Sequence, residues 1–343
     1  MPISESPSLL GSGRRGARSL TIAALLAALL GLSLPAGATA QSRLRVILSG
    51  GFVHHTQAVP AGQTVRFTVT CPPPMRAVAG AVSAIGAHSI ALLSVPTATG
   101  AWAFGLRNTD PAAADTVTVV VTCVRPRLIV PAGLKVKPLQ AVRTATATRI
   151  VPPGATATVG SDCPKGTRPV GVGEVLPGGE KHARAAFAAG DVRTTAVTLE
   201  GRRGAVTVRN TGAVSARVRS QSVCLPTSVS GSTATGRQVR LGTGVQLGGV
   251  EVTVSAGNRF LSTNCRSGQG ALTAGYRFAS DADLLIAGTA LSPGTPNVRW
   301  FIANRTPAAV RMQIELVCAN ARFALLTAGQ RIDTTVGPIT ISG

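Results

Sequence analysis

The stretch VRMQIELVC, residues 310–318, decides the fold class, because its side chains alternate between apolar and mostly polar. The residues on the apolar side are Val310, Met312, Ile314, Leu316 and Cys318. A period of two residues is typical of an antiparallel strand that buries one face. The stretch therefore predicts such a strand, with its cysteine on the side that faces a core.

Two other stretches that end in cysteine repeat the alternation, VRFTVTC at residues 65–71 and VTVVVTC at residues 117–123. No stretch has a sustained helical period, and the nearest candidate, residues 183–189, is ended by Gly190. The chain has 39 Gly and 22 Pro, which fits many short strands separated by turns. We therefore expect an all-β protein.

The six cysteines divide the chain into three units. They are Cys71, Cys123, Cys163, Cys224, Cys265 and Cys318, with successive gaps of 52, 40, 61, 41 and 53 residues. Long and short gaps alternate, which predicts one disulfide across each long gap. The predicted pairs are Cys71–Cys123, Cys163–Cys224 and Cys265–Cys318.

Other residues recur at matching distances from the cysteines. A turn signal that ends in glycine precedes the first cysteine of each pair, and an asparagine stands 14 or 15 residues before the second. The asparagines are Asn108, Asn210 and Asn304. Because asparagine is a favourable turn residue, we interpret them as hairpin turns that precede a closing strand. The agreement of these positions predicts a threefold repeat.

The first forty residues have the features of a secretory signal peptide. Three arginines precede an apolar run at residues 20–34, and Ala38-Thr39-Ala40 matches a cleavage pattern of small residues. Cleavage near Ala40 removes three of 34 basic residues and one of 13 acidic residues, so the net charge changes from +21 to 31 − 12 = +19. We expect a secreted protein, extracellular or periplasmic, with no membrane span in the mature chain.

The predicted architecture is a signal peptide followed by three tandem, disulfide-linked antiparallel β-sandwich domains, Ig-like or related. The expected boundaries are residues 1–40 for the signal peptide and residues 41–126, 127–228 and 229–343 for the domains. Two basic linkers, residues 126–151 and 226–249, can belong to either neighbouring domain. The first contains Lys135 and Lys137, and the second contains Arg237 and Arg240.

We interpret the cysteines as structural. The sequence has no Cys-x-x-Cys motif and no histidine near a cysteine, so neither a metal site nor another cofactor is expected. In the chain-entropy description, a bridge across about 50 residues stabilises a fold by about 4 kcal/mol. That contribution matters in domains whose cores consist mainly of Ala, Val and Leu.

The motif Val-Pro-x-Gly, strand, Cys-Pro-x-Gly, Asn and closing strand into Cys resembles repeats of bacterial secreted β-domains. The second unit, from Cys163-Pro164-Lys165-Gly166 to Cys224, matches this pattern best. The first unit departs from it at Pro74, and the third has no proline after Cys265. A tryptophan between paired cysteines also resembles the immunoglobulin arrangement, which we use for architecture only.

No catalytic motif is present in the sequence, so we expect a structural or adhesive protein that is not an enzyme. The alternative is a secreted hydrolase with a site assembled from distant residues, for which the candidates are Glu174, Glu180, His182 and Asp191. His54-His55 and the Asp281-x-Asp283 pair have too few ligands for a metal site.

The positive charge is the main indication of a partner. Arg217 and Arg219 share one strand face, and Arg202 and Arg203 lie earlier in the same unit. These four arginines are the candidate residues for binding an anionic cell-envelope polymer. Another surface protein is an alternative partner, and nucleic acid is disfavoured because aromatic residues make up only 3% of the chain. A further alternative is assembly into a surface layer or filament through exposed strand edges.

Overall fold

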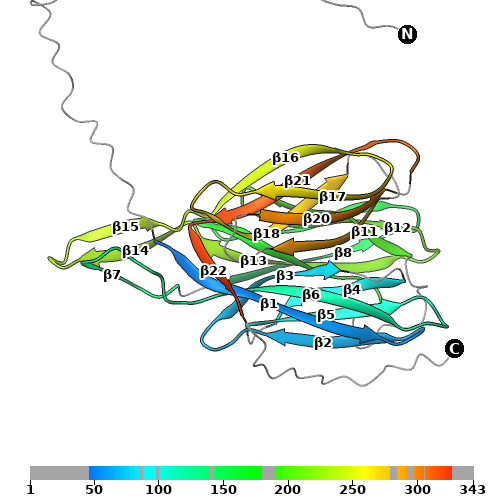
Figure 1. Ribbon diagram of the computed structural model, residues 1–343, viewed down its shortest axis with the longest axis horizontal. Coiled ribbons are helices and arrows are strands. Elements are labelled where there is room, and N and C mark those ends of the chain that lie inside the picture. The colour runs from blue at the N-terminus through cyan, green and yellow to red at the C-terminus, as the bar shows by residue number, and fades with distance from the viewer. Residues whose placement is uncertain are drawn as a thin grey trace, which may run out of the picture. The chain divides into compact units, whose positions relative to one another are not determined.

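The computed structural model describes residues 46–84, 88–97, 100–139, 143–179, 191–278, 284–291, 297–304 and 306–326. These residues form strands and turns without any helix, which confirms the all-β class (Figure 1). Consistently, the described segments include no helix of the length and hydrophobicity that a membrane crossing requires.

Of the 22 strands in the described residues, eighteen fall into three sets of six. The first set is β1 (Leu48–Val59), β2 (Thr64–Thr70), β3 (Arg76–Ala84), β4 (Ser89–Pro96), β5 (Ala101–Asn108) and β6 (Asp115–Val124). The second set is β8 (Arg143–Val151), β9 (Thr156–Asp162), β10 (Thr167–Val175), β11 (Val192–Glu200), β12 (Arg203–Asn210) and β13 (Ala216–Pro226). The third set is β16 (Gln246–Val254), β17 (Gly257–Asn264), β18 (Gly270–Phe278), β19 (Leu284–Leu291), β20 (Asn297–Asn304) and β21 (Val310–Ala319). The other strands are β7 (Leu134–Val136), β14 (Ser228–Thr233), β15 (Gln238–Gly242) and β22 (Ala321–Leu325).

The three sets pair their strands in the same order. The first, sixth and third strands of a set lie side by side in one sheet, and the second, fifth and fourth strands lie side by side in another. One disulfide links the two sheets of each set, with a Cα–Cα distance of 5.7 Å in every case. The bridges are Cys71–Cys123, Cys163–Cys224 and Cys265–Cys318. The structure thus confirms antiparallel sandwiches with the predicted disulfide pairing.

Main-chain hydrogen bonds also join the sets to one another. β4 pairs with β10, where Ser94 lies opposite Glu174, and β11 pairs with β18, where Val197 lies opposite Tyr276. β19 lies against β3, so the third set also contacts the first. The described residues all belong to one compact unit. The division into domains at residues 126 and 228 remains a prediction, and the shared sheets cross it.

The third strands β3, β10 and β18 contact one another, and each carries a β-bulge at the same place. The bulged residues are Val78, Val170 and Leu272, all fully buried. A Cβ atom at Gly171 would lie 2.2 Å from the carbonyl oxygen of Val78, so glycine is required for this close approach. The meeting of the third strands therefore depends on local backbone irregularities as well as on apolar side chains.

The three predicted turn asparagines lie at the turn before the closing strand, and they are buried. The prediction of a hairpin was wrong, because the fifth and sixth strands of each set lie in different sheets. The Nδ2 atom of Asn108 donates to the carbonyl oxygens of Val59 and Ala113, at 3.1 and 2.7 Å. Its Oδ1 atom accepts from the amide of Asp110 at 2.9 Å. Asn210 and Asn304 make the equivalent three bonds. Each asparagine therefore ties its turn to the end of the first strand of the set.

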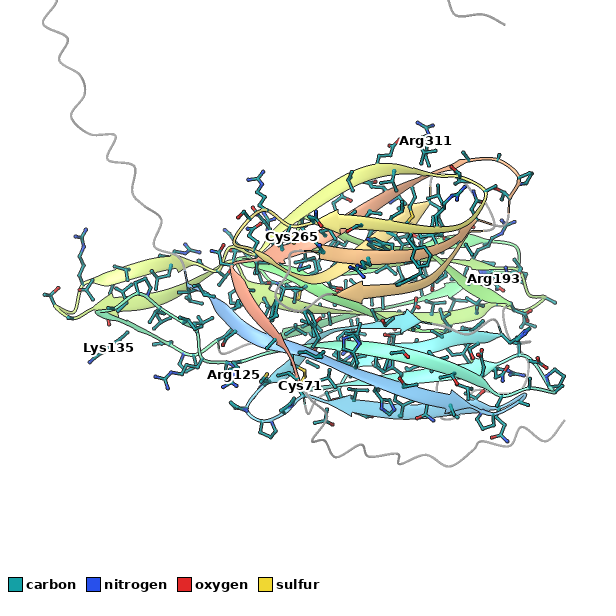
Figure 2. The ribbon with its side chains drawn as sticks, in the orientation of Figure 1. Cys71, Arg125, Lys135, Arg193, Cys265 and Arg311 are labelled. Carbon is teal, nitrogen blue, oxygen red and sulfur yellow. A yellow bond between two sulfur atoms is a disulfide. The ribbon has the colours of Figure 1, made fainter. Side chains whose placement is uncertain are left out.

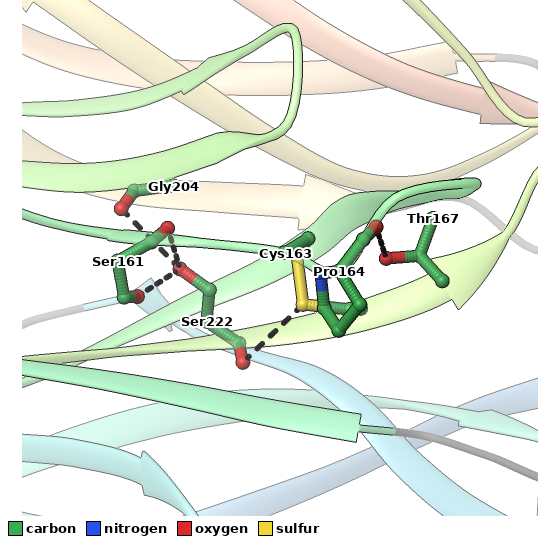
Figure 3. The surroundings of a disulfide bond; sticks show 7 residues. Ser161, Cys163, Pro164, Thr167, Gly204 and Ser222 are labelled. Carbon is green, nitrogen blue, oxygen red and sulfur yellow. Dashed lines mark hydrogen bonds between the residues drawn. A yellow bond between two sulfur atoms is a disulfide. The ribbon is translucent and has the colours of Figure 1, made fainter.

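The described residues of the second set include no aromatic side chain. Trp102 and Trp300 are fully buried in the first and third sets. Counted back from the turn asparagines, Gly204 stands at the position of Trp102 and Val206 at that of Trp300. The Ser222 hydroxyl lies 2.7 Å from the Ser161 hydroxyl and donates to the Gly204 carbonyl at 3.3 Å (Figure 3). A Cβ atom at Gly204 would lie 2.3 Å from Ser222 Oγ. Hydrogen bonds next to the disulfide thus take the place of a large apolar side chain.

The segments between the sets form strands of their own. β7 from the first linker pairs with β14 from the second, and β14 pairs with β15, which makes a separate three-stranded sheet. This sheet projects at the left of Figure 1. β22, which follows β21, pairs in parallel with β1, and the rings of Phe52 and Phe323 lie 5.3 Å apart. The two linkers therefore belong to a sheet that they build together.

Candidate functional site

The four arginines predicted to bind a polyanion do not form one group. Arg202 and Arg203 lie at the cysteine end of the second set, where the Arg202 carbonyl accepts from the amide of Cys163 at 2.7 Å. Arg217 and Arg219 lie on β13, toward its other end and in a different sheet. The structure therefore places the pairs apart, although each pair is internally close.

The charges of two of these arginines are also less available than the sequence indicates. Arg203 Nη1 lies 3.8 Å from the Asp162 carboxylate, and its side chain passes over Gly160. Arg219 is only partly exposed, whereas Arg202 and Arg217 are exposed. These four arginines thus do not form one continuous basic face.

A denser group of cations lies on the three-stranded sheet of β7, β14 and β15 and on the segment that leads from β6 to β7. We use the name basic extension for residues 125–137 and 226–242. It contains six basic residues and no acidic residue. They are Arg125, Arg127, Lys135, Lys137, Arg237 and Arg240.

The two faces of the basic extension differ in polarity. The strand register places Lys135, Ser232 and Gln238 side by side, and Ser230 beside Arg240. On the opposite face, Val136, Gly231 and Val239 are neighbours, and Leu241 there is fully buried. The apolar face packs toward the protein core, and the polar face remains accessible.

All six cations of the basic extension are exposed. Within the described ranges, the ion pairs that the structure shows involve other residues, so no carboxylate neutralises this group. Arg240 Nε donates to Ser228 Oγ at 2.6 Å, which holds the guanidinium along the serine side chains of β14. Figure 2 shows Lys135 and Arg125 on this part of the molecule.

The spacing of these groups suits an extended anion. Lys135 and Arg240 lie on strands that flank β14 on opposite sides, so about 10 Å separates their backbones. Between them, the hydroxyls of Ser230 and Ser232 offer hydrogen-bond donors. Ammonium, guanidinium and hydroxyl groups in this arrangement can contact successive phosphate or carboxylate groups of one chain.

Sequence reasoning recorded the basic linkers but did not bring them together. The two parts of the basic extension are separated by the whole second set, and only the β7–β14 pairing makes them neighbours. The signal that could have identified them is the absence of any acidic residue from both linker portions, in a chain with 13 acidic residues.

Glu174, a candidate for the alternative hydrolase site, lies on β10 and is partly buried. Its carboxylate accepts a hydrogen bond from the Thr194 hydroxyl of β11. Burial raises the pKa of Glu174 to about 7. Burial and the nearby Glu174 charge also raise the pKa of Tyr276. This environment favours a neutral carboxylic acid.

The other hydrolase candidates are not brought to Glu174 by any observed contact. Glu180 and His182 lie outside the described residues, as do Asp281 and Asp283. The Asp191 carbonyl accepts from the amide and the hydroxyl of Thr211. The hydrolase alternative thus rests on Glu174 alone.

The remaining polar candidates have structural roles. His54 and His55 are neighbours on β1, and His55 packs 5.0 Å from the Phe67 ring. Within the described part of the chain, no three His, Cys, Asp or Glu side chains are grouped as a metal site. Asn304, which begins an Asn-x-Thr motif, is 3% exposed and has both amide hydrogens engaged.

Comparison with known proteins leaves the structure as the main guide to function. No protein-family model and no curated protein matches the chain.

Proposed function

We propose that this chain is a secreted bacterial repeat protein, structural or adhesive rather than enzymatic, that binds an anionic cell-envelope polymer through its basic extension. The observation that carries the proposal is the group of six exposed cations without an acidic residue. Three disulfides support maturation in an oxidising compartment, as the signal peptide predicts.

Electrostatics favours the basic extension over the four arginines of the second set. A cation that already has a carboxylate neighbour, such as Arg203, contributes less free energy to the binding of a further anion. The cations of the basic extension have no such neighbour among the described residues, so they reinforce one another toward a polyanion. Exposed charges interact weakly as single pairs, at about 0.2–1 kcal/mol each, but a polymer engages several at once.

The affinity of the mature protein for long-chain inorganic polyphosphate tests this proposal. We expect replacement of Lys135, Lys137, Arg237 and Arg240 by glutamine to weaken binding at low salt by about tenfold or more. The matched control replaces Arg202, Arg203, Arg217 and Arg219 by glutamine, which removes the same total charge.

The proposal requires the control variant to keep most of the affinity. Equal losses in the two variants would show that net charge alone governs binding. Affinity that is unchanged in the extension variant would place the binding surface elsewhere. Binding by the unmodified protein should also fall steeply as salt screens the charges.

A further inference from the structure

The first strands of the three sets, β1, β8 and β16, differ in whether their outer edge is paired with another strand. Each of these first strands pairs on one side with the sixth strand of its set. On the other side of β1, the chain adds β22 in parallel, from Leu48 opposite Ala321 to Phe52 opposite Leu325. In the described ranges, neither β8 nor β16 has a second partner.

The β16 edge lacks the features that normally prevent edge pairing. Native edges are protected by lysine, proline, bulges or covering segments. The nine residues of β16 contain no basic residue and no proline, and their pairing with β21 has no register shift. The one charge, Glu251, is neutralised by Arg311 on β21 at 3.7 Å. The edge is therefore flat and locally uncharged.

The β8 edge, by contrast, has one such feature. Arg149 extends from β8, and its Nη1 atom donates to the Thr158 carbonyl of β9 at 3.3 Å. The side chain thus lies across the seam between the two sheets of the second set. β16 is the less protected of the two edges.

Side chains at the centre of β16 are open to an incoming strand. Val250 is 44% exposed although its β21 neighbour, Ile314, is fully buried. A Cβ atom at Gly248 would have no neighbour within 4 Å. In the first set, β22 places the buried Phe323 at the corresponding edge, so the fold already pairs one equivalent edge with a strand.

We infer that β16 is an interface through which two copies of this chain pair edge to edge in antiparallel orientation. A two-fold axis at Val250 would set this residue opposite its own copy, as an apolar cross-strand pair. It would set Gly248 opposite Val252 and Gly249 opposite Glu251, so Val252 and Glu251 each face a glycine. The five central residues of β16 are therefore self-complementary in this register.

The strand pairing extends the sheet that contains β16 and β21 across the two copies. It buries Val250 and supplies partners to main-chain groups on the β16 edge. Each mature copy carries a net charge of 31 − 12 = +19, so repulsion opposes the association. Salt screens that repulsion and should strengthen the dimer, which is the opposite of its effect on polyanion binding.

The test is the molar mass of the purified mature protein by light scattering, over a range of protein concentration and salt. We expect a reversible dimer that is favoured by salt. Val250→Lys would place two lysines directly opposite each other, so we expect the dimer dissociation constant to rise by about tenfold or more. The matched control is Ile150→Lys, at an exposed apolar residue of β8, which should leave the dimer unchanged.

A second variant keeps the inference testable if Val250→Lys does not fold. Val250→Cys should form a disulfide between two copies under mild oxidation, and Ile150→Cys should not. A protein that stays monomeric at every concentration, or a dimer that Val250→Lys leaves intact, would overturn the inference. Open-ended filaments would also overturn it, because a two-fold interface closes on itself. None of these outcomes bears on polyphosphate affinity, so a failure here leaves the proposed function standing.

Discussion

Asn210 Nδ2 donates a hydrogen bond of 2.9 Å to the carbonyl oxygen of Val151, across 59 residues of sequence. The same nitrogen donates to the Val214 carbonyl at 2.8 Å, and Oδ1 accepts from the Gly212 amide at 3.0 Å. All three bonds recur at Asn108 and Asn304. In each set, one buried side-chain amide thus holds the end of the first strand to the turn that precedes the sixth strand.

Asn210→Ala should therefore destabilise the protein more than other substitutions at turn positions. It removes both donors and leaves the carbonyl oxygen of Val151 buried without its partner, which costs about 2 kcal/mol or more. The midpoint of urea unfolding measures the loss. Thr211→Ala is the control, because it removes only an exposed bond of 3.1 Å to the Asp191 carbonyl. Similar midpoints for the two variants would contradict this role for the asparagine.

The stability of the protein should depend on the ionisation of Glu174. Its folded-state pKa is raised by burial from 4.5 to about 7, so its protonated form is favoured by folding. The resulting stabilisation is full below about pH 4.5 and is lost as pH rises through about 7, by a total of about 3 kcal/mol. Unfolding free energies from pH 5 to pH 8 measure this loss.

Glu174→Gln isolates that contribution, because glutamine keeps an acceptor for Thr194 but does not ionise. The comparison is needed because burial lowers the pKa of His54, which works in the opposite direction as pH falls. We expect the stability difference, variant minus parent, to grow as pH rises toward 8. A difference that is constant across this range would show that Glu174 does not titrate there.

Gly171→Ala should disturb the meeting of the third strands. The added Cβ atom would lie 2.2 Å from the Val78 carbonyl oxygen and 3.0 Å from Ala79 Cα, so backbone must move. Overpacking of this kind costs about 1–3 kcal/mol. Thermal unfolding measures the change, with Gly242→Ala as the control because nothing lies within 4 Å of its added Cβ. Equal melting temperatures for the two variants would refute the close approach.

Loss of the Cys163–Cys224 disulfide should be the most damaging of the three disulfide losses. Removing a bridge that spans 61 residues costs about 4 kcal/mol in the chain-entropy description. The second set has fewer large apolar side chains to compensate, since Ser161, Ser222 and Gly204 occupy its centre. Paired Cys→Ala variants of each bridge, compared by urea unfolding, test the order. A larger loss of unfolding free energy on removal of the Cys71–Cys123 bridge would contradict this order. It would show that core composition does not determine how strongly each set depends on its disulfide.

Sequence pattern was sufficient for the local structure. The period of two in residues 310–318 marks β21, and the alternating cysteine gaps identify the three disulfide partners. Strand alternation can be recognised because it is a property of a single segment. The disulfide partners can be recognised because the cysteine spacing repeats three times. The asparagines were predicted as turn residues, but their hydrogen bonds to the first strand depend on tertiary packing that spacing does not encode.

Contacts between the sets were not predictable in the same way. The pairing of Ser94 with Glu174 joins strands that look alike in sequence to many others. A Cβ atom at Gly173 would lie 2.3 Å from the Ser94 carbonyl oxygen, so this approach depends on one glycine among many in the sequence. The basic extension was missed for a similar reason, because β7 and β14 lie in different linkers. Arg203 and Arg217 are near in sequence, whereas the sandwich places them in different sheets.

Retention of the mature protein on isolated cell envelopes, measured over a salt series, tests the central claim most directly. The unmodified protein and the variant with four glutamines at Arg202, Arg203, Arg217 and Arg219 should both be retained at low salt and released as salt increases. The variant with four glutamines in the basic extension should be retained poorly even at low salt. Retention of that variant equal to the unmodified protein, or retention of the unmodified protein that salt does not reduce, would contradict the account.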